Sequence, residues 1–343
     1  MQNKLVSLLT PMYNTEKYVH RLLDSVLSQD YPSIEMIVVD DGSTDNSRAI
    51  VEDYIERFSA RGYSLRYIYQ DNAGQSVAIK NGLPLVSGEY LAWPDSDDFY
   101  SADNAISKMV GVLEDASPEF QMVRTQEILV EDETFKPLKI AGLDAHEEED
   151  RSLFEDCLFS TNGFYYCSGA YMIRTAVLKE LTDFEIYTEK NAGQNWQLML
   201  PILYAYRCKT IMEPLYTVVS RTTSHSRGQY TSYEQFAQRY DSYFNTQIET
   251  LKRIKGFPEE SILDYQNCLR IHYDWQLHEH ALQQNNREAA LATLYACEGN
   301  LGRPILFIRK VILHIWGGTY IINAYRRFHH FCFLVKSRLK SCI

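Results

Sequence analysis

The first hundred residues alternate between short apolar runs and amphipathic segments. Leu5–Thr10 and Glu35–Val39 are apolar runs that end at Pro11 and at Asp40, and both have the pattern of buried parallel strands. Between them, Thr15–Gln29 carries apolar residues at helical spacing. Because parallel neighbours need a crossover connection, this order predicts a doubly wound α/β sheet with right-handed crossovers.

The alternation continues as far as Trp93. Ser43 to Asp45 open a second helix, and a strand, a helix and another strand follow at Leu65–Tyr69, Ser76–Val86 and Tyr90–Trp93. In doubly wound sheets, ligands bind at the carboxyl ends of the strands. The residues at those ends are therefore the candidate binding site: Thr10, Pro11, Tyr13, Asp40, Asp41 and Asp95–Asp98.

The run at Tyr90–Trp93 is followed at once by three carboxylates, Asp95, Asp97 and Asp98. Like charges this close repel one another, so either water or a hard divalent cation has to offset them. Ligand sets of oxygen alone favour Mg²⁺ or Mn²⁺ over zinc. From these residues alone, a solvated acidic turn and a metal site both remain open.

Two common phosphate-binding loops are missing from the sequence. No GxGxxG follows the first strand and no GxxxxGK[ST] occurs, which argues against a dinucleotide-dependent dehydrogenase and a P-loop NTPase. A nucleoside diphosphate can approach Asp95 and Asp97 only with a cation between them. Asp41 can bond a base or ribose or cap the next helix, and Tyr13 can stack on a base or pack internally.

Four segments resemble glycosyltransferase family 2 in their order and spacing: Thr10–Asn14, Val38–Asp45, Asn72–Ser76 and Asp95–Asp98. The resemblance is strong over residues 4–100 and weaker over residues 100–225. It implies the GT-A fold, an inverting mechanism and a nucleotide-sugar donor, with a UDP-sugar expected, held through Mn²⁺ or Mg²⁺. The chain would then be a metal-dependent hexosyltransferase.

The resemblance also assigns roles to individual residues. Thr10 and Pro11 would line the base pocket, Asp41 would bond the base or ribose, and Lys80 would either touch a phosphate or face solvent. The full set of expected donor-binding residues is Thr10, Pro11, Tyr13, Asp41, Lys80, Asp95 and Ser96.

The expected metal ligands are Asp97 and Asp95, and the metal would offset charge on the leaving nucleoside diphosphate. Asp98 is a candidate catalytic residue that can instead support the loop. Arg221–Arg227 mixes cationic, hydroxyl and imidazole groups, so it suits either a diphosphate or, through His225, a third metal ligand. A plain surface loop is the alternative for this segment.

Inverting transfer needs a general base to take the proton of the acceptor hydroxyl. Members of the family commonly place an acidic pair where this chain has Gln194 and Asn195, and an amide cannot act as a base. Glu189 on the same loop is the substitute candidate, followed by Asp183 and Glu185, although each can be a solvated carboxylate. The expected acceptor-binding residues are Gln194, Asn195 and Trp196, and Trp196 can also pack in the core.

The missing acidic pair keeps a second class of function open. The chain is expected to be an active transferase that serves a lipid-linked or glycan acceptor in the synthesis of surface polysaccharide such as capsule. The alternative is a catalytically inactive, nucleotide-sugar-binding scaffold subunit of a polysaccharide synthesis complex.

Residues 1–228 are predicted to form the catalytic domain, with a nucleotide-binding half at 1–100 and an acceptor half at 101–228. The acidic stretch at 126–150 is typical of an exposed hairpin or lid. From Tyr233 the pattern turns helical, with a break at Gly256–Pro258. Residues 229–343 are therefore predicted to be a helical region.

Charge is distributed unevenly along the chain. The net charge is −11, but residues 303–343 hold eight Lys or Arg and no Asp or Glu, which leaves −19 on residues 1–302. The acidic body argues against nucleic acid as a partner, whereas the basic, aromatic tail suits an anionic membrane surface. The alternative for the tail is a helical cap that packs on the catalytic domain or on a second copy in a homodimer.

Compartment is inferred from cysteines and hydropathy. The seven cysteines are scattered without a CxxC pair, which argues against a disulfide framework and a zinc site. No apolar run is long enough for a signal peptide or a transmembrane helix. These features predict a cytoplasmic protein, peripheral at the inner face of the cell membrane.

Overall fold

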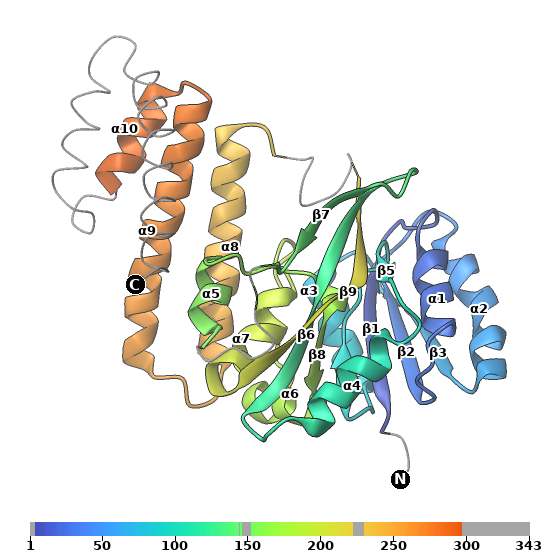
Figure 1. Cartoon of the computed structure of the whole chain (residues 1–343). Coiled ribbons are helices and arrows are strands. Elements are labelled where there is room, and N and C mark those ends of the chain that lie inside the picture. Colours follow the sequence, from blue (N-terminus) through green and yellow to red (C-terminus); the bar gives the residue numbers. More distant parts are fainter. Residues whose placement is uncertain (1–3, 144, 146–151, 222–229, 297–343) are drawn as a thin grey trace. The chain divides into compact units, whose positions relative to one another are not determined.

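The computed structural model describes residues 4–143, 145, 152–221 and 230–296 (Figure 1). The chain forms two compact units, Met1–Gln229 with Asn245–Ile262, and Tyr230–Phe244 with Leu263–Ile343. In the second unit, the description covers 230–244 and 263–296. The domain boundary expected at residue 228 stays a prediction.

The first unit is built on a nine-stranded sheet, of which the first four strands pair in parallel in the order β3-β2-β1-β4. These strands are β1 (Val6–Met12), β2 (Ile34–Asp40), β3 (Ser64–Tyr69) and β4 (Tyr90–Ala92). The intervening helices are α1 (Val19–Leu27), α2 (Ser47–Arg61), α3 (Gln75–Gly82) and the 3₁₀ turn η1 (Leu83–Leu85). The predicted β-α-β order is confirmed.

Local sequence explains these elements. Every residue of β1 and β2 is buried, as expected for central strands covered on both faces. Helix α1 buries a single stripe of apolar residues at helical spacing, made by Val19, Leu22, Leu23 and Val26. The first strand was predicted to end at Pro11, but it continues to Met12. The pairing between β1 and β4 ends at Leu8. Pro11 lacks an N–H, but β4 needs no hydrogen bond at that position.

The second half of the sheet is mixed. Its strands are β5 (Phe99–Tyr100), β6 (Phe120–Glu131), β7 (Pro137–Ala141), β8 (Tyr171–Arg174) and β9 (Arg207–Ser220). Strand β6 runs parallel to β9, whereas β4–β8, β6–β8, β5–β9 and β6–β7 are antiparallel. The β6–β7 hairpin confirms the predicted hairpin in the acidic stretch, and residues 144 and 146–150 of that stretch lie outside the described residues.

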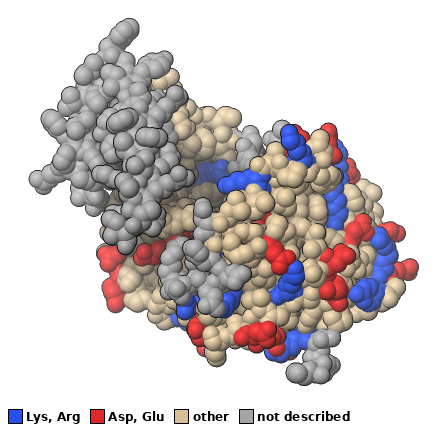
Figure 2. All heavy atoms as spheres, in the orientation of Figure 1, with Lys and Arg blue, Asp and Glu red and all other residues tan. Residues whose placement is uncertain are grey.

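Among the described residues between 105 and 205, this unit also contains four helices and a 3₁₀ turn. They are α4 (Ala105–Asp115), α5 (Phe154–Phe159), η2 (Ser168–Ala170), α6 (Thr175–Thr182) and α7 (Asn195–Ala205). Helix α7 begins directly after Gln194. In Figure 2, Lys and Arg side chains are interspersed with Asp and Glu on the face in view, so charge does not mark a single binding region on that face.

The helical C-terminal region begins with α8 (Tyr233–Arg253) and α9 (Glu259–Gln283), followed by α10 (Arg287–Ala296). The break between α8 and α9 confirms the interruption predicted at Gly256–Pro258. Within the second unit the rings of Phe236 and His280 stack with centroids 3.7 Å apart, and Ala281, Leu282, Ala290 and Leu294 form a small apolar core.

The basic, aromatic segment of residues 303–343 lies outside the described residues. Among the helices that the structure describes, none combines the length and the apolar character needed to cross a membrane.

Turn η2 passes so close to β9 that only glycine fits at position 169, because a Cβ there would overlap the ring of Tyr216. We expect Gly169→Ala to lower the free energy of unfolding by about 1–3 kcal/mol, since overpacking forces side chains or backbone to shift. Urea denaturation followed by circular dichroism measures this difference.

Gly111→Ala is the matched control. Gly111 is exposed within α4, and a Cβ there has no neighbour within 4 Å. The control should raise stability by up to about 1 kcal/mol, because alanine loses less backbone entropy in a helix. A neutral Gly169→Ala would show that the Tyr216 ring moves aside without cost.

Candidate functional site

Strand β1 carries the first predicted residues to the carboxyl edge of the parallel strands. Thr10 and Pro11 are buried, whereas Tyr13, just beyond the strand, is 45% exposed. The hydroxyl of Thr10 is buried without a hydrogen-bond partner in the described part of the chain. An exposed ring beside a buried strand end leaves Tyr13 available to stack on a planar ligand.

Asp41 organises the loop that follows β3. Its carboxylate accepts hydrogen bonds from Gln70 Nε2 at 2.7 Å, from the Ala73 N–H at 2.8 Å and from the Gly74 N–H at 2.9 Å. Gly74 has φ of 101°, and a Cβ there would lie 2.5 Å from the carbonyl oxygen of Lys190. Asp41 therefore holds a loop that packs against the segment before α7, a contact that sequence reasoning missed.

Asp95 is surrounded by neutral donors. Ser168 Oγ donates to it at 2.9 Å, Gln194 Nε2 at 3.0 Å and Gln75 Nε2 at 3.3 Å. Burial raises the pKa of Asp95 to about 6, although the hydrogen bonds from Ser168 and Gln194 and the charge of Arg221 act in the opposite direction. No motif marks Ser168, so the sequence did not single it out.

The first turn of α7 faces this carboxylate. Gln194 is 1% exposed, and Asn195 Oδ1 accepts a hydrogen bond from Trp93 Nε1 at 2.9 Å. A carboxylate in place of the Gln194 amide would stand beside Asp95 and repel it. The amides therefore suit a site in which Asp95 is already partly desolvated.

Trp196 lies in the core, with its indole N–H donating to the carbonyl oxygen of Cys157 at 2.9 Å. The Trp196 ring also contacts Tyr166 edge to face, and the residue is 8% exposed. This is the packing alternative that the sequence left open, and an acceptor role for Gln194, Asn195 or Trp196 stays a prediction.

Asp97 and Asp98 have partners of a different kind. Asp97 forms an ion pair with Arg221, the residue that follows β9, and Asp98 accepts a hydrogen bond from the Val219 N–H at 2.8 Å. Asp98 is 6% exposed and Ser96 is 5% exposed. Protein groups therefore offset the repulsion within the acidic turn. From the sequence, water or a metal was expected to have this role. Asp98 joins the turn to β9, as its loop-supporting alternative predicts.

The segment that carries Glu189 lies beside this turn. Glu189 Oε2 accepts a hydrogen bond from the Tyr187 hydroxyl at 2.8 Å, and the Glu189 carbonyl accepts one from Ser76 Oγ at 3.1 Å. Ser76 is next to Gln75, which contacts Asp95. Lys80 forms an exposed ion pair with Glu185 at 3.4 Å.

The third expected metal ligand, His225, lies outside the described residues. Within the described ranges, no three His, Cys, Asp or Glu side chains form a cluster that could hold a metal. Mg²⁺ and Mn²⁺ commonly use only one or two carboxylates, with phosphate oxygens and water completing the shell. Asp97 and Asp95 supply hard oxygen ligands, so they fit a metal that arrives with a phosphate ligand better than a metal held by protein alone.

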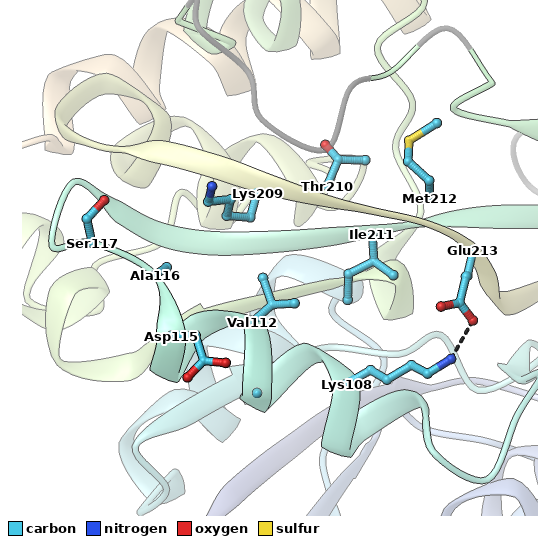
Figure 3. A pocket seen from close by; sticks show the side chains of 11 residues that line it. Lys108, Val112, Asp115, Ala116, Ser117, Lys209, Thr210, Ile211, Met212 and Glu213 are labelled. Atoms are coloured by element: carbon cyan, nitrogen blue, oxygen red, sulfur yellow. Dashed lines mark hydrogen bonds and ion pairs between the residues drawn. The ribbon is translucent and has the colours of Figure 1, made fainter.

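A separate hollow of about 770 Å³ lies between α4, the loop after it and the first half of β9 (Figure 3). Lys108 and Glu213 form an ion pair on its wall. None of the predicted donor, acceptor or metal residues lines this hollow.

A model of glycosyl transferase family 2 matches residues 7–182. Glycosyltransferase GlyA of Streptococcus pneumoniae is 42% identical over 98 residues, which cover 29% of this chain and 14% of GlyA. The putative teichuronic acid biosynthesis glycosyltransferase TuaG of Bacillus subtilis is 38% identical over 111 residues, which cover 32% of this chain and 42% of TuaG. The match thus spans less than half of either relative.

Two solved structures of similar fold match most of the chain. TarS residues 1–349 of S. aureus, in complex with UDP-GlcNAc, has a TM-score of 0.57 at 18% identity, covering 94% of this chain and 92% of that one. The mannosyltransferase PcManGT of Pyrobaculum calidifontis, in complex with GDP-Man and Mn²⁺, has a TM-score of 0.53 at 17% identity, covering 94% and 84%. The first unit has the GT-A fold of glycosyltransferases, and the chain belongs to glycosyl transferase family 2.

The surroundings of Asp95 predict that the free energy of unfolding depends on pH. Its pKa in the folded protein, about 6, lies above the ordinary value of 3.8, so folding favours the protonated form. This contribution to stability is complete below pH 4 and is lost as the pH rises through 6. The shift corresponds to at most about 3 kcal/mol, which partial exposure reduces to about 1–2 kcal/mol.

We therefore expect Asp95→Asn to raise the free energy of unfolding by about 1–2 kcal/mol at pH 7.5, with a smaller gain at pH 5. Urea denaturation in the presence of a metal chelator measures both values. Asp53→Asn, at an exposed position of α2, is the control and should change stability little at either pH. A gain from Asp95→Asn that is equal at both pH values would refute the assigned cause.

Proposed function

We propose that this protein is an inverting glycosyltransferase that moves a sugar from a nucleoside diphosphate, with UDP as the nucleotide, to a lipid-linked or glycan acceptor in surface polysaccharide synthesis. The observation that carries the proposal is the meeting of three features at one edge of the parallel strands. They are the Thr10–Tyr13 strand end, the loop held by Asp41 and the acidic turn Asp95–Asp98.

The donor is proposed to lie across this edge. Tyr13 offers an exposed ring to the base, and the buried Thr10 hydroxyl marks the floor of the base pocket. Asp41 accepts three hydrogen bonds from its own loop, so its role includes shaping the pocket wall as well as any bond to the base or ribose. Complexes of TarS with UDP-GlcNAc and of PcManGT with GDP-Man support a nucleotide-sugar as the ligand class.

The diphosphate is proposed to meet Asp97 and Asp95 through Mn²⁺ or Mg²⁺. When bound, the cation would offset charge on the departing diphosphate. The hydrogen bond from the Val219 N–H to Asp98 fixes the turn that carries Asp97. Asp95, fixed by Ser168 and Gln194, is proposed to face the donor ribose or sugar.

Glu189 is proposed as the general base, because the first turn of α7 presents amides where a carboxylate would otherwise stand. Its segment packs against Gly74 and Ser76, which places it beside the donor loop. A hydrogen bond from Tyr187 orients its carboxylate. Glu180, at an exposed position of α6, is a suitable control because it belongs to none of the proposed sites.

A scaffold subunit that binds the nucleotide-sugar without transferring it is the second candidate. The buried amide of Gln194 beside Asp95 favours it, since this pair leaves no acid at the position that the family commonly uses. A cytoplasmic location at the inner face of the membrane, through the basic segment of residues 303–343, belongs to the same proposal.

Isothermal titration with UDP and UDP-sugars tests donor binding. We expect binding that depends on Mn²⁺ and that Asp97→Ala weakens by at least about 10-fold, because the carboxylate contact to the cation is lost. Asp53→Ala, at an exposed position of α2, should leave the affinity unchanged. If no nucleoside diphosphate or its sugar binds the wild type, the proposed donor site is wrong.

Turnover separates the two candidates. With a donor that binds, we expect Glu189→Gln to lower kcat by about 10²- to 10⁴-fold, the usual contribution of a general base. Glu180→Gln should retain most of the activity. If Glu189→Gln keeps the activity of the wild type, Glu189 is not the base. A wild type that binds the donor but transfers nothing to any tested acceptor would favour the scaffold.

A further inference from the structure

We infer that Arg221 neutralises Asp97 only while the donor site is empty. When a divalent cation arrives with the nucleotide, the guanidinium of Arg221 would leave the Asp97 carboxylate and bind the diphosphate. This inference rests on the proposed donor site, and it adds an order to ligand binding. The cation alone should bind weakly, and the cation with its nucleotide should bind well.

The first observation is competition for one carboxylate. Arg221 contacts Asp97 through Oδ2, and the side chains of Arg221 and Asp97 are 18% and 20% exposed. Charges that are mostly withdrawn from water interact more strongly than surface pairs. A guanidinium and a divalent cation cannot share this carboxylate without repelling each other, so each weakens the binding of the other.

The second observation is unused donor capacity on Arg221. Its Nε is buried and has no hydrogen-bond partner in the part of the chain that the structure describes. A guanidinium carries five N–H donors in a planar fork that matches two phosphate oxygens. Asp97 contacts Nη2 of this fork, and the Tyr18 hydroxyl forms a hydrogen bond with the same guanidinium. The buried Nε is therefore the unused donor that an anionic ligand would have to reach.

The third observation is a fixed support beneath the guanidinium. Arg221 Cζ lies 4.6 Å from the centroid of the Tyr18 ring, a cation–π distance. The Tyr18 hydroxyl donates to Asp132 at 2.9 Å, and Arg21 lies 3.7 Å from the same carboxylate. Tyr18 is thus anchored to the β6–β7 hairpin, so Arg221 can change partners while it stays on the same aromatic face.

These contacts have a consequence for binding. With the cation alone, Asp97 has to give up Arg221, and the guanidinium is left beside a second positive charge. With the diphosphate present, the guanidinium gains an anionic partner in exchange. The cation and the nucleotide should therefore each raise the affinity for the other, and Arg221 should carry part of that coupling.

The test uses Mn²⁺ binding, followed by the electron paramagnetic resonance signal of the free ion, with and without UDP. We expect Arg221→Met to bind Mn²⁺ alone about 5- to 10-fold more tightly than the wild type, because the competitor is gone. In the presence of Mn²⁺ it should bind UDP at least about 10-fold more weakly. These opposite shifts are a pattern that a loss of structure does not produce.

Arg221→Lys is a second variant, which tests the inference even if Arg221→Met fails to fold. It keeps the positive charge but loses the planar fork, so Mn²⁺ affinity should stay near that of the wild type while UDP affinity falls. Arg57→Met is the matched control. Arg57 pairs with Asp24 at 2.9 Å and lies 4.0 Å from the Tyr54 ring centroid, the same combination of ion pair and aromatic support on α2. Arg57→Met should change neither the affinity for Mn²⁺ nor the affinity for UDP.

The outcomes separate this inference from the proposed function. If the wild type binds UDP with Mn²⁺ but Arg221→Met shows unchanged or weaker Mn²⁺ binding, the exchange is wrong and the donor site stands. If the wild type binds no nucleotide, the donor site is wrong and the exchange falls with it. Tighter Mn²⁺ binding with unchanged UDP affinity would overturn the pairing of Arg221 with the diphosphate.

Discussion

The arrangement of the site depends on how the protein neutralises three carboxylates within four residues. Asp95, Asp97 and Asp98 each recruit a different partner: neutral side chains, a guanidinium and a backbone N–H. Because these partners come from η2, α7 and the end of β9, the acidic turn joins the mixed half of the sheet to the parallel half. The same contacts that allow the turn to fold also bring the later segments to the carboxyl edge of the parallel strands.

The neutral partners of Asp95 fit the amides that this chain carries at Gln194 and Asn195. A partly desolvated carboxylate with a raised pKa tolerates an amide neighbour and is destabilised by a second carboxylate. Gln194 and Asn195 are therefore consistent with the charge state of their surroundings. Glu189, the proposed base, lies on the segment before α7, and Ser76 holds its backbone carbonyl there.

Two loops of the proposed donor site are mechanically linked. Asp41 holds Ala73 and Gly74 through their N–H groups, and Gly74 packs against Lys190, one residue after Glu189. The loop held by Asp41 and the segment that carries Glu189 are therefore in direct contact.

The sequence by itself determined the β-α-β order and placed the candidate donor residues at the carboxyl ends of the parallel strands. These features follow from periodicity and from polar residues at strand ends, which are local properties. Only the tertiary structure decided which groups surround the acidic turn. Ser168 and Gln194 lie 73 and 99 positions away from Asp95, and no local pattern marks either as its partner. The side-chain packing of Trp196 and the pairing of Arg221 with Asp97 likewise depend on contacts between distant segments.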